Sequence, residues 1–208
     1  MNSKTVITIG RQCGSRGKTI GKKVAEALGV KCYDKELLAV AAKESGLCKE
    51  LFENHDEKPT NSFLYSLVMD TYSLGYTSSY SDMPINHKVF LAQFDAIKKL
   101  AERESCVIIG RCADYALEDN PYAMSIYIKA DMDKRVKRIM TKYQLNESKA
   151  SDMIQKEDKR RASYYNYYSS KKWGDAKSYD LCLDSGKLGV EGSIELIKDF
   201  IALREKNF

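Results

Sequence analysis

The sequence predicts an α/β fold in which a five-stranded parallel sheet is covered by helices on both faces. Short runs rich in β-branched and apolar residues alternate with segments whose apolar residues recur every three or four positions, a pattern typical of strands and helices in turn. The run Cys106–Ile109 is continuously apolar, as expected of a strand buried on both faces of a parallel sheet. A length of 208 residues fits one domain with a small insertion, so we treat residues 1–208 as a single domain.

The first part of the chain is predicted to form two strands and two helices. Residues 4–9 are rich in β-branched side chains, which favours a strand. The helix that follows has apolar residues at four-residue spacing and ends at Gly29. These apolar residues are Ile20, Val24 and Leu28. A short second strand over 30–33 and a helix over 35–45 come next.

Residues 50–86 interrupt this alternation. The segment contains two prolines and a polar start, then apolar residues at helical spacing between 63 and 72, and a loop-like stretch over 75–84. We interpret it as a small, partly helical cap inserted into the domain. It could be a substrate lid or a dimer surface, and the aromatic residues over 63–80 make a homodimer a hypothesis worth testing.

The remaining chain continues the alternation. Helices are predicted where apolar residues recur at helical spacing: over 87–104, over 132–143, from a cap at Asn146 past Arg161, and around 190–201. Strands are predicted at the short apolar runs 106–109, 124–128 and 179–183. Ligands in such parallel sheets bind at the carboxyl ends of the strands.

The composition excludes several classes of protein. No apolar run approaches the roughly 20 residues that span a bilayer, and the N-terminal residues show no signal-peptide pattern, so we expect a cytoplasmic protein without membrane association. A net charge of +5 is too small for a dedicated nucleic-acid binder but fits a cleft that gathers phosphates. Six cysteines without a C-x-x-C pair, and only two histidines, argue against a zinc site and for reduced thiols.

The stretch ITIGRQCGSRGKTIG, residues 7–21, places a glycine-rich turn between the first strand and the first helix. Such a turn binds phosphate groups because its backbone N–H groups point inward and the helix adds its positive end. Lys18 would reach the β- and γ-phosphate oxygens, and the Thr19 hydroxyl would bind Mg²⁺. The strict phosphate-loop pattern has glycine where this chain has Gln12. The residues expected to bind nucleotide are Cys13, Gly14, Ser15, Arg16, Gly17, Lys18 and Thr19.

Two other interpretations of this turn stay open. Asp34 follows Gly14 by 20 residues, where a dinucleotide-binding fold has its ribose-binding acid, but the G-x-G triplet of that motif is absent. Alternatively, the turn joins strand and helix without binding a ligand. Amides at the helix end could also lower the pKa of the Cys13 thiol, although we favour the interpretation that Cys13 is only a small loop residue.

Phosphoryl transfer needs several cations that neutralise phosphate oxygens, and arginines occur at suitable places. Arg111 directly follows the strand over 106–109, at the ligand edge of the sheet. Arg160 and Arg161 lie late on a helix and before a polar, tyrosine-rich loop. Further candidates are Arg16 in the glycine turn and the i, i+3 pair Arg135 and Arg138.

Two carboxylates and a tyrosine cluster complete the candidates. Asp34 and Asp114 each follow a predicted strand, so either could orient a hydroxyl group or a Mg²⁺-bound water; Asp34 could equally cap the helix over 35–45. The tyrosine-rich residues 163–173 could stack the bases of a single strand. We favour a lid that packs its aromatic faces on the core, because the adjacent arginines imply a closing segment.

Four parts of the chain resemble the cytidylate kinase-like family, a bacterial branch related to the nucleoside monophosphate kinases. These are ITIGRQCGSRGKTIGKKVAEALGVKCYDKELL, then VIIGRCADYAL, then SIYIKADMDKRVKRI, and finally KEDKRRASYYNYY with YDLCLDSG. The resemblance implies a P-loop NTPase-type sheet, a small helical insertion at 50–86 that binds the nucleoside monophosphate, and a short lid at 156–178. It also implies transfer of the ATP γ-phosphate to CMP or dCMP with Mg²⁺.

The expected roles follow in the same way. Residues 14–19 would cradle the ATP phosphates, and Arg160 and Arg161 would bridge donor and acceptor. The expected catalytic residues are Lys18, Arg111, Arg160 and Arg161. The expected acceptor-binding residues are Asp34, Arg111, Asp114 and Arg135, and the expected Mg²⁺ ligands are Thr19 and Asp34.

Two alternative functions are kept. Gln12 motivates a nucleotide-binding regulatory module without turnover. If residues 50–86 shape a different pocket, the chain is instead a kinase for a small non-nucleotide acceptor.

Overall fold

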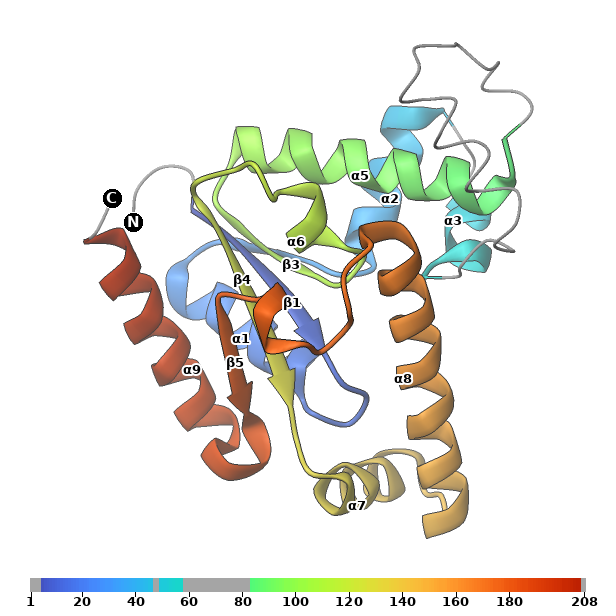
Figure 1. Ribbon diagram of the computed structural model, residues 1–208, viewed down its shortest axis with the longest axis vertical. Helices are drawn as coiled ribbons and strands as arrows, with labels where there is room; N and C mark the ends of the chain where they lie inside the picture. Colours follow the sequence, from blue (N-terminus) through green and yellow to red (C-terminus); the bar gives the residue numbers. More distant parts are fainter. Residues whose placement is uncertain (1–4, 47–48, 58–82, 207–208) are drawn as a thin grey trace.

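The computed structural model describes residues 5–46, 49–57 and 83–206, which form one five-stranded parallel sheet with helices on both faces (Figure 1). The strands are β1 (Val6–Arg11), β2 (Lys31–Tyr33), β3 (Cys106–Ile109), β4 (Ala123–Lys129) and β5 (Leu181–Asp184). They pair in the order β2-β3-β1-β4-β5, and every neighbouring pair is parallel. The predicted fold class is confirmed, and each predicted strand lies within two residues of its expected ends.

The helices cover the sheet in two layers. They are α1 (Gly17–Leu28), α2 (Glu36–Ser45), α3 (Lys49–His55), α5 (Ile85–Arg103), α6 (Ala113–Ala116), α7 (Met132–Tyr143), α8 (Glu147–Ser169) and α9 (Ser185–Glu205), with a short 3₁₀ helix η2 (Ala176–Ser178). One apolar cluster joins α1 and α9 to one face of the sheet. A second cluster joins α2, α3, α5 and α6 to the other face, because successive strand residues point to opposite faces.

The pairing register brings the ends of three strands to one edge. Ile9 of β1 pairs with Ile109 of β3, and in both strands this isoleucine is followed by a glycine and then by an arginine, Arg11 and Arg111. β2 ends one pairing step earlier, so Asp34 comes to the same edge. The loop between β1 and α1 also leaves the sheet there, which makes this edge the place where charged groups gather.

The long helix α8 corrects one expectation. Its predicted cap is confirmed, because the Asn146 side chain accepts a hydrogen bond from the Lys149 backbone N–H at 2.9 Å. The tyrosine-rich loop expected after Arg161 is wrong, since α8 continues as helix to Ser169. Three tyrosines, Tyr164, Tyr165 and Tyr168, share one buried side of this last part. Burial of that side explains why the segment is helical despite its polar composition.

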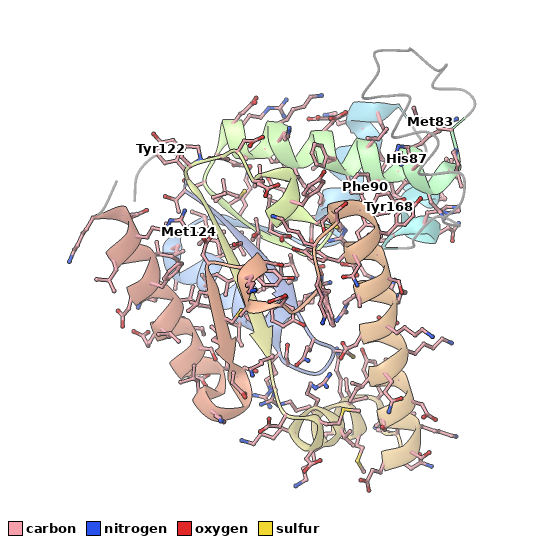
Figure 2. All side chains as sticks on the ribbon, viewed as in Figure 1. Met83, His87, Phe90, Tyr122, Met124 and Tyr168 are labelled. Carbon is pink, nitrogen blue, oxygen red and sulfur yellow. The ribbon has the colours of Figure 1, made fainter. Side chains whose placement is uncertain are left out.

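The aromatic side chains of α8 pack against α5 and the sheet. The rings of Phe90 and Tyr168 are stacked with their centroids 3.9 Å apart, and Figure 2 shows these two side chains facing each other. Tyr165 stacks with Tyr179 beside β5 at 6.1 Å. Aromatic stacking adds to the free energy gained by burial, so the carboxyl-terminal part of α8 is fixed to the body of the protein.

Only the two ends of the expected insertion at 50–86 are described. α3 packs through the fully buried Phe52 onto the core of α2 and α5, and Asp56 and Glu57 follow it in a turn. At the other end, Met83 and the start of α5 are placed. The apolar residues 63–72, most of the stretch 75–84 and the proposed dimer surface lie outside the described residues.

Candidate active site

The loop between β1 and α1 turns through two residues with positive φ. Gly14 has φ 76° and Arg16 has φ 61°. A Cβ atom added to Gly14 would lie 3.0 Å from the Cβ of Arg135, so glycine is required there both for its conformation and for the close approach of α7. Arg16 is the exposed residue immediately before α1.

The carbonyl groups of this loop are all bonded on one side. Arg135 donates from Nη1 to the Cys13 carbonyl at 3.3 Å, and Arg138 donates from Nη1 to the Gly14 carbonyl at 3.2 Å. The Ser185 hydroxyl donates to the Ser15 carbonyl at 2.6 Å. In a trans peptide the C=O and the next N–H point in opposite directions. The N–H groups of Gly14 and Arg16 therefore point away from these carbonyl partners, as a phosphate-binding loop requires, whereas the Ser15 N–H donates to the Gln12 carbonyl at 3.3 Å.

Gln12 and Asp158 also shape the loop. The Gln12 side-chain oxygen accepts a hydrogen bond from the Ala130 backbone N–H at 3.0 Å, which ties the loop to the end of β4. Asp158 of α8 accepts from the Cys13 backbone N–H at 2.7 Å and pairs with Arg135 at 2.5 Å. Gln12 thus has a structural role of its own at the position where the strict pattern has glycine.

The structure overturns the idea that Cys13 has a reactive thiol. Cys13 is 8% exposed and packs in an apolar cluster between α7 and α8. Burial raises the pKa of its thiol, which disfavours the thiolate form that reacts. Cys13 is therefore a small loop residue, as the favoured interpretation holds.

Lys18 and Asp34 form an ion pair beside the loop. The Lys18 Nζ lies 2.5 Å from the Asp34 Oδ2, and the Lys18 side chain is 53% exposed. Burial alone would raise the pKa of Asp34, but the hydrogen bond with Lys18 and the charge of Arg111 outweigh burial and hold that pKa below its ordinary value. α2 begins at Glu36 with Lys35 as its cap residue, so the Asp34 side chain faces the loop rather than capping that helix.

Thr19 and Asp34 are the predicted oxygen ligands for a magnesium ion near the loop. Thr19 is exposed on the first turn of α1, and Asp34 is 5% exposed. Over residues 5–46, 49–57 and 83–206, no group of three histidine, cysteine, aspartate or glutamate side chains could hold a metal ion. Mg²⁺ in phosphoryl-transfer sites takes only one or two protein oxygens, together with water and substrate phosphates, so a hydroxyl and one carboxylate fit this ion.

Arg111 is buried at the centre of the charged edge. It donates from Nε and Nη2 to the two carboxylate oxygens of Asp56 at 2.9 and 2.8 Å, and its Nη1 lies 3.5 Å from Asp34. Burial alone would lower the pKa of Arg111, but Asp56 and Glu57 raise it above its ordinary value. Arg111 also has φ 55°, a strained conformation for a residue with a side chain. The surrounding contacts fix this arginine in one orientation.

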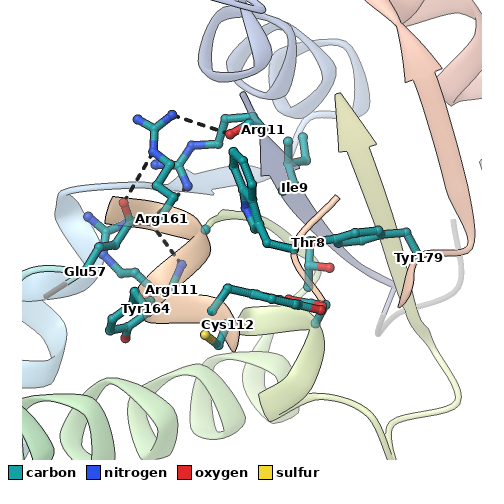
Figure 3. Close-up of a pocket in the computed structure, with 14 residues that line it drawn as sticks. Thr8, Ile9, Arg11, Glu57, Arg111, Cys112, Arg161, Tyr164 and Tyr179 are labelled. Atoms are coloured by element: carbon teal, nitrogen blue, oxygen red, sulfur yellow. Dashed lines mark hydrogen bonds and ion pairs between the residues drawn. The ribbon is translucent and has the colours of Figure 1, made fainter. Parts of the chain in front are cut away.

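Sequence reasoning missed four residues of this cluster: Arg11, Asp56, Glu57 and Glu157. The Glu57 carboxylate lies 3.0 Å from Nη1 of Arg11 and 3.6 Å from Nε of Arg161 (Figure 3). It also lies 3.8 Å from Nη2 of Arg160. A signal for Arg11 was present, because β1 and β3 end in the same Ile-Gly-Arg triplet. Nothing comparable marks Glu57, which lies in the segment with the weakest pattern.

Asp114 is partly buried and is bonded to a tyrosine of α8. It accepts a hydrogen bond from the Tyr165 hydroxyl at 2.6 Å, and burial raises the pKa of its carboxyl group. The cavity that Asp114 lines with Thr8, Tyr179, Arg111 and other residues has a volume of about 20 Å³. That volume holds about one water molecule, so this cavity has no room for a nucleotide base.

The structure joins five of the predicted residues in one charged network and leaves Arg135 and Asp114 outside its ionic contacts. Lys18, Asp34, Arg111, Arg160 and Arg161 are joined by ionic contacts that run through Asp56, Glu57 and Glu157. Arg135 lies on the carbonyl side of the loop, away from these contacts, and Asp114 joins the aromatic residues of α8.

The buried carboxylate of Glu57 predicts that the stability of the fold depends on pH. Burial alone would raise the pKa of Glu57, but Arg11, Arg161 and Arg111 hold it well below its ordinary value. A depressed carboxyl pKa stabilises the fold above the unfolded-chain value of about 4.3 and loses that effect as the pH falls further. We expect the free energy of unfolding, measured in urea by circular dichroism, to fall from pH 5 to pH 3. Asp34 contributes with the same sign.

The variant Glu57→Gln checks the assignment. It should flatten the pH dependence between pH 5 and pH 3, because glutamine does not titrate. Glu195→Gln removes an exposed acid and should leave the slope as in the wild type. Equal slopes in wild type and Glu57→Gln would contradict the prediction.

The chain is similar to known proteins in sequence and in fold. A model of the cytidylate kinase-like family matches residues 6–187. Cytidylate kinases from Pyrococcus horikoshii and Methanococcus vannielii are each 25% identical to the chain, over 197 and 201 residues, which is 94% of this chain and 87% and 99% of theirs. A solved structure of an uncharacterized protein from Eubacterium ventriosum is 32% identical, with a TM-score of 0.69 over 95% of this chain and 98% of that one.

A more distant structure is similar in fold alone. Shikimate kinase from Bacteroides thetaiotaomicron is 14% identical, with a TM-score of 0.55 over 95% of this chain and 98% of that one. Among the helices that the structure describes, none combines the length and apolar character needed to cross a bilayer.

Proposed function

Because the chain belongs to the cytidylate kinase-like family, and is a kinase that binds nucleotides, we propose that it transfers the γ-phosphate of ATP to CMP, dCMP or a similar small acceptor. The observation that carries this proposal is the position of four arginines at one edge of the sheet. Arg11 and Arg111 follow β1 and β3, and Arg160 and Arg161 reach the same place from α8. The glycine loop with Lys18 lies beside them.

The loop residues are proposed to bind the donor. The N–H groups that follow the bonded carbonyls of Cys13 and Ser15 would face the ATP phosphates, and the amino end of α1 adds its positive potential. Lys18 would leave Asp34 for the β- and γ-phosphate oxygens. Thr19 and Asp34 would hold Mg²⁺, which when bound neutralises charge on those oxygens.

The arginine cluster is proposed to bind the acceptor and the transferring group. An oxygen of the acceptor phosphate would form a bond to the γ-phosphorus as the bond from that phosphorus to the bridging oxygen breaks and ADP leaves. Arg111 would orient the acceptor through its planar guanidinium. Arg160 and Arg161 would neutralise the oxygens of the transferring phosphoryl group, with Asp114 and Arg135 proposed as further acceptor-binding residues. The chemistry needs no covalent intermediate.

The decisive experiment is an assay that couples ADP formation to a spectroscopic signal. Purified protein with MgATP would be offered CMP, dCMP, UMP, AMP, GMP and, as non-nucleotides, shikimate and gluconate. ADP formation with CMP or dCMP above the rate without acceptor supports the proposal. If ADP forms only with a non-nucleotide, the chain is a kinase for a small non-nucleotide acceptor. If calorimetry shows ATP binding but no acceptor gives ADP, the chain is a nucleotide-binding regulatory module.

A further inference from the structure

Two consecutive carboxylates, Asp56 and Glu57, enter the arginine cluster from the turn after α3. Asp56 binds Arg111 through both of its oxygens. Glu57 is 5% exposed, and its Oε1 lies within 3.4 Å of the Arg111 backbone N–H as well as 3.0 Å from Arg11. Paired carboxylate oxygens on a guanidinium fork have the geometry with which a phosphate group binds arginine.

The charges around Glu57 are already nearly balanced. In the part of the chain that the structure describes, five cationic side chains, Lys18, Arg11, Arg111, Arg160 and Arg161, face four carboxylates, Asp34, Asp56, Glu57 and Glu157. A phosphate monoester brings almost two further negative charges at neutral pH. Adding it to a balanced, buried cluster is unfavourable unless a carboxylate leaves.

The backbone at Glu57 is the place where the cluster would change when a carboxylate leaves. Glu57 has φ 51°, a left-handed conformation that is strained for a residue other than glycine and persists only where surrounding contacts impose it. Here those contacts are the ionic bonds to arginine. Release of the carboxylate would remove this strain, whereas Phe52 keeps α3 itself packed on the core.

The arginines keep hydrogen-bonding capacity that the carboxylates do not use. The Nε atoms of Arg160 and Arg161 are buried and have no hydrogen-bond partner among the residues that the structure describes. A phosphate group with three terminal oxygens can accept more of these bonds than one carboxylate can. The cavity of about 20 Å³ beside Glu57 is too small for a phosphate monoester while the carboxylate stays in place.

We propose that the Glu57 carboxylate, supported by Asp56, occupies the position of the acceptor's phosphate group in the ligand-free protein and that a phosphate monoester displaces it on binding. This inference rests on the proposed function, because it takes the arginine cluster as the acceptor site. It makes Glu57 an internal competitor that lowers the apparent affinity for the acceptor. An acceptor without a phosphate group would not displace it.

The test compares binding of CMP and of inorganic phosphate to wild type and Glu57→Gln by titration calorimetry. Removing the competing charge should tighten CMP binding by roughly 10- to 100-fold, and inorganic phosphate should show the same direction. Glu44→Gln is the matched control, because Glu44 also binds two cations, Lys99 and Arg103, but between α2 and α5. Its CMP affinity should equal that of the wild type.

Unchanged or weaker CMP and phosphate binding in Glu57→Gln would overturn the inference. A weaker affinity together with a lower kcat would show that Glu57 positions the arginines instead. If the variant does not unfold cooperatively in buffer, thermal unfolding is followed in rising phosphate. Recovery of a cooperative transition supports an anion site that Glu57 normally fills, and failure to recover overturns it. Because the readouts that decide the inference are binding and folding, they stand apart from the ADP assay that tests the proposed function; kcat serves only to assign the cause of a weaker affinity.

Discussion

Arg111→Ala should lower kcat/KM for the acceptor by roughly 10³-fold or more, the scale reported for arginines that stabilise a transferring phosphoryl group. The side chain is buried, is oriented by Asp56 and Asp34, and follows β3 at the ligand edge. Its planar fork suits two oxygens of a phosphate, and no neighbouring side chain can take that position without moving. Steady-state rates of ADP formation over a range of CMP concentrations measure the effect.

The same substitution removes the main partner of buried carboxylates, so stability must be measured beside activity. Loss of one partner of a buried ion pair costs about 3–5 kcal/mol. Arg111→Lys keeps the charge but loses the fork, and should recover much of the stability while kcat/KM stays low. Arg103→Ala, at an exposed arginine of α5, should change neither. Wild-type kcat/KM in a folded Arg111→Lys would contradict the assigned role.

Lys18→Ala should lower kcat by about 10²- to 10³-fold, the usual cost of losing one donor to a developing charge, and should raise the KM for ATP. Lys18 is the one cation of the ionic network that belongs to the first turn of α1, beside the loop N–H groups. Its side chain is half exposed and held only by Asp34, so it can move to a phosphate at little cost. Rates at saturating CMP and varied ATP separate kcat from KM.

Lys22→Ala serves as the control for Lys18, because Lys22 lies one turn further along α1 and is exposed. It should leave kcat and KM for ATP near the wild-type values. ATP affinity and kcat both unchanged in Lys18→Ala would remove the donor role from the loop lysine. The charge of the glycine loop would then come from its amides alone.

The fold was predictable because its signals are local and repeated. A continuous apolar run such as 106–109 indicates a strand that is buried on both faces of a parallel sheet. Four-residue spacing, as in Ile20, Val24 and Leu28, indicates a helix that is buried on one face. The prediction for the tyrosine-rich end of α8 was wrong, because its composition suggested a polar loop. Helix formation there depends on contacts with Phe90 and Tyr179, which are distant in sequence.

The site was predictable where it is encoded next to a strand end, and in Arg160 and Arg161 by a basic pair late on a helix. Asp34 and Arg111 each follow a strand directly, and the glycine loop follows β1. Glu57 and Asp158 have no such signal, because an acid that will be buried against arginines looks the same in sequence as a solvated one. Their partners lie 46 and 145 residues away along the chain, so only the folded structure shows that these charges meet.

The two anchors of α8 have a kinetic consequence. Its first part packs Ala150 and Ile154 against α7, and its last part stacks Tyr168 on Phe90. The arginines that α8 carries lie between these points on an unbroken helix of 23 residues. Their backbone can therefore shift only by tilting of the helix as a whole, a collective displacement of the microsecond-to-millisecond class. Solvent friction, set by the viscosity of the medium, would then govern how fast this end of the molecule rearranges during turnover.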